Sequence, residues 1–219
     1  MSDTINLVIF DCDGVLLDSE IIACAADAEA LRNIGFDITT EQVAMHFAGI
    51  PDEAIDLIFE KKLGRPLPEN FRADIKRKVL DKYRTELQPI EGAKSLLSVM
   101  KTNKCIASSA TPAKLALGLV NADLYELVYP HIFSARLVVR GKPHPDIFEY
   151  AARVMDVPAE RCLVLEDSVA GVTAAKAAGM KCVGFTGGSH CQAGHADRLR
   201  DAGAYLVIER LEQMLDIVA

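Results

Sequence analysis

The stretch at residues 5–20, reading INLVIFDCDGVLLDSE, constrains the fold of this chain more than any other. An apolar run that ends abruptly at acidic residues is typical of a fully buried strand of a parallel sheet. Ligands of open α/β sheets bind beyond the carboxyl ends of the strands, where this sequence places Asp11 and Asp13. Strand alternation puts both carboxylates on one side and Cys12 on the other. Because like charges need a cation or a proton between them, the pair is a candidate Mg²⁺ site with an acid–base partner, or else a helix cap beside a turn.

Composition limits the classes of protein that this chain can belong to. Half of the 219 residues are hydrophobic, which suits one large domain or a core with a small second unit. The net charge of −7 and the lack of a basic run argue against nucleic acid or an anionic membrane as the main partner. The six cysteines show no CxxC pairing, and the start of the chain has no signal-peptide pattern. We expect a cytoplasmic protein with free thiols, either a monomer or a small homo-oligomer.

A block of helices interrupts an otherwise alternating strand–helix pattern. Residues 18–86 carry helix start and stop signals and no convincing strand, and strand–helix units resume after residue 92. Repeated strand–helix units predict an α/β fold with a doubly wound, Rossmann-like parallel sheet. We therefore expect a core domain of residues 1–17 and 87–219, with an inserted α-helical cap domain at residues 18–86.

Polar side chains follow several of the predicted strands and should meet at one rim of the sheet. These residues are Asp11, Asp13, Ser108, Lys142, Glu166 and Asp167. Taken singly, each has a structural interpretation, such as a helix cap or a solvated lysine. Together they supply carboxylates for a hard cation, a nucleophile, an ammonium group and a hydroxyl donor, which is what phosphoryl transfer requires.

In this order and spacing the residues resemble the haloacid dehalogenase-like (HAD) phosphohydrolase superfamily. Its four motifs are similar to DCDGVLLDSE, to the SSA of residues 108–110, to GKPHPDIF and to LEDSVAGVTAAKAAGM. The helical block is similar to the small cap of the β-phosphoglucomutase-like branch. The resemblance covers nearly the whole chain and implies a doubly wound core with an inserted cap over the site.

The resemblance also implies a role for each residue. Asp11 would attack phosphorus and form an aspartyl-phosphate, while Asp13 would act as general acid and then general base. The implied phosphate-binding residues are Ser108, Ser109 and Lys142. The implied Mg²⁺ ligands are Asp11, the backbone carbonyl of Asp13, Asp167 and, directly or through water, Glu166.

Departures from the family pattern favour hydrolysis over the related chemistries. The dehalogenases lack the second acid, so Asp13 argues against them. Ala23 stands where the mutase branch usually has a cap histidine, and in the stretch 48–52 Asp52 stands where it has an arginine for a second phosphate. We expect a Mg²⁺-dependent phosphatase of a small phosphorylated metabolite, a sugar or sugar-acid phosphate. The alternatives are a β-phosphoglucomutase-like phosphomutase and a phospho-ligand-binding protein without turnover.

Substrate choice should depend on the cap and on the loops of the core. The cap candidates are Glu20, His46, Lys76 and Arg77. The core-loop candidates are His144, Ser189 and His190, and no role is predicted for His195. Each of these residues also reads as an ordinary surface or packing residue.

Overall fold

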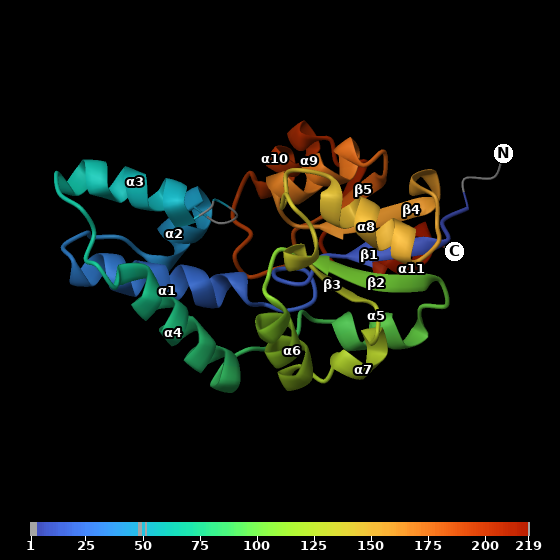
Figure 1. Cartoon of the computed structure of the whole chain (residues 1–219), viewed down its shortest axis with the longest axis horizontal. Coiled ribbons are helices and arrows are strands. Elements are labelled where there is room, and N and C mark those ends of the chain that lie inside the picture. The colour runs from blue at the N-terminus through green and yellow to red at the C-terminus, as the bar shows by residue number, and fades with distance from the viewer. Residues whose placement is uncertain (1–3, 48–49, 51, 219) are drawn as a thin grey trace.

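The computed structural model describes residues 4–47, 50 and 52–218, so three positions of the stretch 48–52, in which Asp52 was compared with the mutase arginine, lie outside it. Six parallel strands form one sheet in the order β3-β2-β1-β4-β5-β6 (Figure 1). This order, with β1 near the centre and crossovers on both sides, is doubly wound and confirms the predicted fold class. The strands are β1 (Leu7–Phe10), β2 (Asn103–Ser108), β3 (Ile132–Ser134), β4 (Cys162–Glu166), β5 (Lys181–Phe185) and β6 (Leu206–Ile208).

The register of the central strands brings distant parts of the chain to one rim. Phe10 is level with Ile106 on β2 and with Leu165 on β4. The Asp11 N–H donates to the Leu165 carbonyl at 2.9 Å, which continues the ladder one residue beyond the strand. The residues that follow β1, β2 and β4 therefore leave the sheet at the same edge, as the sequence predicts.

Helices cover both faces of the sheet because the central strand is apolar on both sides. Val8 and Phe10 belong to one buried cluster, and Leu7 and Ile9 to another. The first cluster includes side chains of α5 (Ala93–Val99), α6 (Pro112–Asn121), α7 (Tyr125–Val128) and α11 (Gln213–Ile217). The second includes side chains of α8 (Asp146–Val154), α9 (Val169–Ala177) and α10 (His195–Ala202). Two short 3₁₀ helices, η1 (Ala135–Leu137) and η2 (Ala159–Arg161), complete the core.

The first four helices after β1 have an apolar cluster of their own beside the sheet (Figure 1). They are α1 (Glu20–Asn33), α2 (Thr40–Phe47), α3 (Asp52–Leu63) and α4 (Phe71–Thr85). The two chain segments that lead into and out of this block are paired with each other. The Asp18 N–H donates to the Gln88 carbonyl at 3.0 Å, and the Ile90 N–H donates to the Leu16 carbonyl at 2.9 Å.

Three helices differ from the sequence expectation. Pro68 predicts the start of a helix, because proline is favoured in the first turn, but α4 begins three residues later, at Phe71. Helices α7 and α10 were not predicted. Helix α7 has one turn, and α10 (HADRLRDA) buries only His195 and Leu199, so neither gives a clear apolar period.

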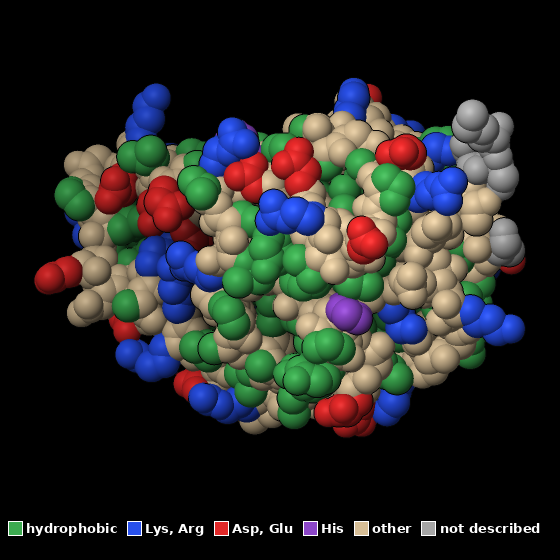
Figure 2. Space-filling model, turned by 45° about the vertical axis from the view of Figure 1, so that its right-hand side comes forward, with side chains coloured by type: hydrophobic (Ala, Val, Ile, Leu, Met, Phe, Trp, Pro, Cys, Tyr) green, Lys and Arg blue, Asp and Glu red, His purple; other side chains and the backbone are tan. Residues whose placement is uncertain are grey.

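The surface and the cysteines agree with the sequence analysis. On the face shown in Figure 2, Lys and Arg side chains are interspersed with Asp and Glu, without a continuous basic patch. All six cysteines are free, and Cys191 alone is not fully buried. Within the described ranges, no helix has both the length and the apolar character needed to span a bilayer.

Candidate active site

A buried lysine joins two carboxylates at the rim of the sheet. Lys142 Nζ lies 2.5 Å from Asp11 Oδ1 and 2.6 Å from Glu166 Oε1, and it donates to the Ala107 carbonyl at 3.0 Å. Only 4% of the Lys142 side chain is exposed. Burial alone would lower the pKa of Lys142, but Asp11 and Glu166 raise it above its ordinary value, so the side chain is a cation. Three sequence motifs thus meet at one ammonium group.

The environment of Asp11 suits a further cation. Burial raises the pKa of Asp11 well above its ordinary value; Lys142 opposes this shift, and the charges of Glu166 and Asp167 add to it. A second positive charge beside Asp11 would restore its ionised form, which a nucleophile needs. The described side chains therefore present more buried negative charge here than Lys142 alone neutralises.

Glu166 is fixed by the start of the helix that follows it. Its Oε2 accepts hydrogen bonds from the Ser168 N–H at 3.0 Å and from the Ser168 hydroxyl at 2.9 Å. The same hydroxyl oxygen accepts the Gly171 N–H at 3.0 Å and so caps α9. A Cβ at Gly171 would collide with the Glu166 carboxylate, so the glycine makes room for it.

Gly171→Ala is therefore expected to lower the free energy of unfolding by about 1–3 kcal/mol, as overpacking does. A decrease would point to the contact with Glu166, because replacing glycine by alanine inside a helix usually raises the free energy of unfolding by about 0.5–1 kcal/mol. Urea denaturation measures the change. Gly141→Ala is the matched control, since a Cβ there meets nothing within 4 Å, and its change should stay within about 0.5 kcal/mol. A Gly171→Ala variant as stable as the parent would show that Glu166 is not held in this position.

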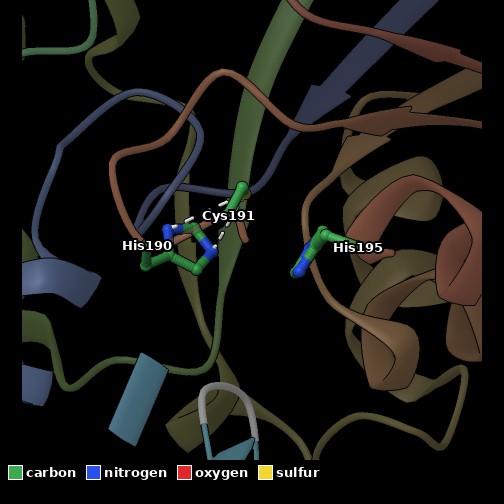
Figure 3. A group of neighbouring side chains, drawn as sticks. All are labelled: His190, Cys191 and His195. Atoms are coloured by element: carbon green, nitrogen blue, oxygen red, sulfur yellow. Dashed lines mark hydrogen bonds between the residues drawn. The ribbon is translucent and has the colours of Figure 1, made fainter. Parts of the chain in front are cut away.

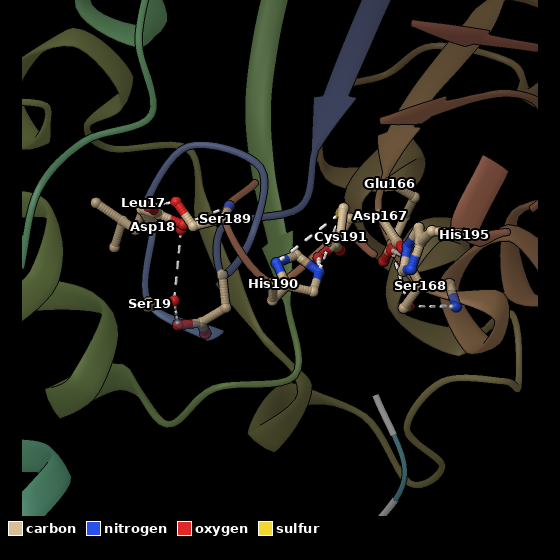
Figure 4. Close-up of polar contacts among 12 residues, drawn as sticks. Leu17, Asp18, Ser19, Glu166, Asp167, Ser168, Ser189, His190, Cys191 and His195 are labelled. Carbon is tan, nitrogen blue, oxygen red and sulfur yellow. Dashed lines mark hydrogen bonds and ion pairs between the residues drawn. The ribbon is translucent and has the colours of Figure 1, made fainter. Parts of the chain in front are cut away.

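Asp167 is held by two histidines of the segment after β5 (Figure 4). His190 Nε2 lies 3.0 Å from Asp167 Oδ2, and His195 Nε2 lies 2.6 Å from the Asp167 carbonyl oxygen. Although burial opposes it, the hydrogen bond to Asp167 raises the pKa of His190 to about 11, so its ring is a cation at neutral pH. The next residue back, Ser189, donates from its N–H and its hydroxyl to the Asp18 carboxylate, at 3.0 and 2.5 Å. This segment thus connects Asp167 to the entrance of the helical block.

Gly14 lets the first loop approach Asp167. Its φ of +80° is in the left-handed region that glycine adopts readily. A Cβ at this position would collide with the Asp167 carboxylate and would lie 2.9 Å from His190 Cε1. The loops after β1 and β4 are therefore in contact, as a shared ion would require.

Asp13 accepts three hydrogen bonds on one oxygen. The donors to its Oδ1 are the Ser19 hydroxyl at 2.6 Å, the Tyr83 hydroxyl at 2.7 Å and the Lys114 ammonium at 3.0 Å. Burial raises the pKa of Asp13, but Lys114 and the two hydroxyls outweigh it and leave the pKa below its usual value. Asp13 is thus a carboxylate tied both to the core and to the two ends of the helical block.

Sequence reasoning missed Lys114 and Tyr83. Lys114 lies in the first turn of α6, directly after β2, so its place near the rim could have been inferred from the Thr111 cap. Tyr83 gave no such signal, because an aromatic residue in an amphipathic helix reads as packing. It is 1% exposed, and only its hydroxyl reveals the connection to Asp13.

The predicted phosphate-binding serines differ in exposure. Ser108 is 1% exposed, and its hydroxyl oxygen accepts the Ala110 N–H at 3.0 Å. That contact uses a lone pair of the oxygen and not its hydrogen, so the hydroxyl can still donate to a ligand. Ser109 is exposed at the end of β2, where its backbone follows the same rim.

The four substrate residues predicted in the helical block are not equivalent. Glu20 is near the site, because Lys114, Asp13 and Asp167 all affect its pKa. Burial raises the pKa of Glu20 to about 7. The charge of Lys114 opposes this shift, and the charges of the two aspartates add to it. The other three are exposed. Lys76 pairs with Asp52 and Arg77 with Asp74, both on the helical block, and His46 contacts the neighbouring Phe47 ring. These contacts do not tie the three side chains to the carboxylates, so their roles stay predictions.

The donor set fits a hard divalent cation. Asp11 and Asp167 are carboxylates at adjacent strand ends, each with a pKa raised by burial and by neighbouring negative charge. Oxygen donors of this kind are those that Mg²⁺ prefers. Gly14 leaves room for the Asp167 carboxylate to lie against the loop that follows β1.

The chain belongs to the haloacid dehalogenase-like hydrolase family, whose model matches residues 5–179. It is 31% identical over 191 residues to 6-phosphogluconate phosphatase of Escherichia coli, with 85% of each chain covered. This class of relative confirms the prediction of a phosphoric monoester hydrolase.

Solved structures agree with the family assignment. A conserved haloacid dehalogenase-like protein of unknown function from Agrobacterium tumefaciens superposes with a TM-score of 0.94 at 39% identity, covering 98% of this chain and 97% of that one. A HAD family hydrolase from Deinococcus radiodurans, solved with bound phosphate and sodium, has a TM-score of 0.85 at 30% identity. The match covers 100% of this chain and 96% of that one. The fold and the recognised superfamily are thus confirmed over nearly the full length.

Proposed function

We propose that this protein is a Mg²⁺-dependent phosphatase that hydrolyses a small phosphorylated metabolite, a sugar or sugar-acid phosphate, through an aspartyl-phosphate on Asp11. The observation that carries the proposal is the buried Lys142 ammonium between Asp11 and Glu166, at a rim that also holds Asp13 and Ser108. The similarity to 6-phosphogluconate phosphatase supports a sugar-acid substrate.

In the first half-reaction the Asp11 carboxylate attacks phosphorus and the bond to the leaving oxygen breaks. Lys142 and the Ser108 hydroxyl donate to the phosphoryl oxygens and so offset the charge that develops on them. Asp13 gives a proton to the leaving oxygen. In the structure three donors hold Asp13 as a carboxylate. Its hydrogen bonds from Ser19 and Tyr83 must therefore break before Asp13 can take up the proton that it gives to the leaving oxygen.

In the second half-reaction water attacks the phosphoryl group on Asp11. Asp13, now a carboxylate, accepts the water proton, and the P–O bond to Asp11 breaks to release phosphate. Splitting the reaction in this way lets one pair of acids serve both as nucleophile and as acid–base catalyst.

Asp11, the Asp13 carbonyl and Asp167 would hold Mg²⁺, with Glu166 assisting. When bound, the ion would neutralise charge on the reacting phosphoryl group and on Asp11. Glu166 is engaged by Lys142 and Ser168, so it is better placed to orient the other groups than to bind the ion directly.

We propose further that residues 18–86 form a cap domain that covers this rim and selects the substrate. The α1–α4 block has its own apolar cluster, and its entry and exit segments run side by side. Ser19 and Tyr83 lie at its two ends and both contact Asp13. Movement of the block would therefore reach the acid–base residue directly.

The surroundings of Asp52 support hydrolysis over the mutase alternative. Arg72 pairs with Asp52 at 3.4 Å, with Asp27 at 2.7 Å and with Asp56 at 2.5 Å, and Lys76 pairs with Asp52 at 3.5 Å. Arg72 thus engages three carboxylates and Lys76 engages one of them, and this concentration of negative charge would disfavour a second phosphate.

Phosphate release tests the proposal. The purified protein is offered a panel of sugar and sugar-acid phosphates with Mg²⁺, after treatment with a chelator, and after Mg²⁺ is restored. We expect turnover of at least one sugar or sugar-acid phosphate, a loss of about 10²-fold or more on chelation, and recovery with Mg²⁺. Undiminished turnover in chelator would exclude the metal role. Isomerised product that depends on a bisphosphate would favour the mutase, and a folded protein inert towards the whole panel would favour a binding protein.

A further inference from the structure

Three side chains with nitrogen and sulfur donors gather beside Asp167 and take no chemical part in the proposed reaction. They are His190, Cys191 and His195 (Figure 3). One donor atom from each lies within 4.8 Å of the other two. Both histidines are buried, whereas Cys191 is half-buried, so the group has a route to solvent.

The spacing of Cys191 and His190 suits two ligands of one ion. Cys191 Sγ lies 3.4 Å from Nε2 and 4.0 Å from Nδ1 of His190. A tetrahedral Zn²⁺, with bonds of about 2.3 Å to sulfur and about 2.0 Å to nitrogen, keeps neighbouring donors roughly 3.5 Å apart. Thiolate and imidazole donors favour ions of this kind, whereas Mg²⁺ prefers oxygen.

The hydrogen bonds of His195 show which of its nitrogens carries the proton. Nε2 must donate, because its partner is the Asp167 carbonyl oxygen at 2.6 Å. Nδ1 must accept, because its partner is the Arg198 guanidinium at 3.0 Å. Histidines commonly bind metals in this form, with one ring N–H donated to a backbone carbonyl and a lone pair on the other nitrogen. Arg198 is exposed, so its side chain can move away from Nδ1 when an ion binds.

Asp167 contacts one member of the group, His190, through a carboxylate oxygen, which makes it the candidate fourth donor. His190 Nε2 is 3.0 Å from Asp167 Oδ2, so an ion bound by His190 would lie next to this carboxylate. An ion at the His190–Cys191 pair would take the place of the N–H between His190 and Asp167. The ring proton and the thiol proton would pass to solvent as it binds.

We propose that His190, Cys191 and His195 form a second metal site, for a divalent transition-metal ion of the zinc type, with an Asp167 oxygen as the fourth donor. Because Asp167 is also a proposed Mg²⁺ ligand, an ion in this site draws that carboxylate away and inhibits the phosphatase. The site goes beyond the proposed function, since it can bind its ion whether or not the protein hydrolyses phosphate.

Cobalt(II) is the probe, because its bond to a thiolate gives a charge-transfer absorption in the near ultraviolet that oxygen and nitrogen ligands do not give. The metal-free, full-length protein is titrated with Co²⁺, and Zn²⁺ is then added to displace it. We expect one Co²⁺ per chain with a thiolate band. Cys191→Ser should remove the band, and His195→Asn should weaken Co²⁺ and Zn²⁺ binding by about 10–100-fold. The matched control is His144→Asn, an exposed histidine outside the group, which should bind as the parent does.

Two results would overturn the proposal. One is a folded parent protein without a thiolate band, and the other is a band of full strength in the Cys191→Ser variant, which would assign the sulfur to another cysteine. Circular dichroism establishes whether each variant is folded. If the His195→Asn variant is unfolded, the thiolate band of the Cys191→Ser variant decides whether the metal site exists. A final arm measures phosphate release in Mg²⁺ with added Zn²⁺, where inhibition should require about tenfold more Zn²⁺ in the Cys191→Ser variant. If the parent has no phosphatase activity, this arm fails while the Co²⁺ titration still stands, so the two proposals are tested separately.

Discussion

Asp11→Asn is expected to abolish phosphate release while the protein stays folded. The amide is nearly the same size as the carboxylate but cannot attack phosphorus, and removal of a catalytic nucleophile costs on the order of 10⁴-fold or more in turnover. Its carbonyl oxygen can still accept from Lys142, which also keeps Glu166 and the Ala107 carbonyl. The loss should therefore appear in turnover and not in the urea midpoint.

Steady-state phosphate release and urea denaturation of both proteins measure this effect. The matched control is Asp81→Asn, an exposed aspartate paired with Arg84 on the same helix, which should change neither quantity. Turnover by the Asp11→Asn variant above a few per cent of the parent would remove Asp11 as the nucleophile. Loss of folding in this variant would instead show that the carboxylate is structural.

Lys142→Met is expected to damage both stability and turnover. It leaves the buried carboxylates of Asp11 and Glu166 without their shared cation, and removal of one partner of a buried ion pair costs about 3–5 kcal/mol. Loss of the ammonium also removes a donor to the phosphoryl group. Urea denaturation in the presence of a chelator measures the stability term without any contribution from bound metal.

The stability deficit of Lys142→Met should shrink as the pH falls. Burial already raises the pKa of Asp11, and loss of the lysine raises it further. A group whose pKa is higher in the folded state stabilises that state below its unfolded pKa, and this stabilisation is lost as the pH rises through the folded value. The variant should therefore come closest to the parent in acid, where Asp11 is protonated.

The control for this variant is Lys94→Met, which removes an exposed lysine paired with Asp123. Its free energy of unfolding should stay within about 0.5 kcal/mol of the parent at every pH. A Lys142→Met deficit below about 1 kcal/mol, or one that grows in acid, would show that the two carboxylates do not depend on this lysine.

The sequence by itself determined the sheet and the rim where the carboxylates meet. Buried strands are local features: an apolar run such as residues 5–10 has to leave water, and the acids that follow it have to stay at its end. Because the carboxyl ends of parallel strands share one edge, the sequence predicts that Lys142 and Asp11 lie close together, although 131 positions separate them. The free cysteines and the helical block followed from equally local patterns.

Only the tertiary structure decided which side chains hold those acids in place. Tyr83 and Lys114 converge on one oxygen of Asp13, and His190 and His195 converge on Asp167. The direction in which a helical side chain points depends on how its helix packs, and residue spacing does not contain that information. For the same reason, the sequence did not show that His46, Lys76 and Arg77 are exposed on the surface of the helical block. The place of the acids could thus be predicted from the strand ends, whereas the contacts that hold them form only when the helices dock.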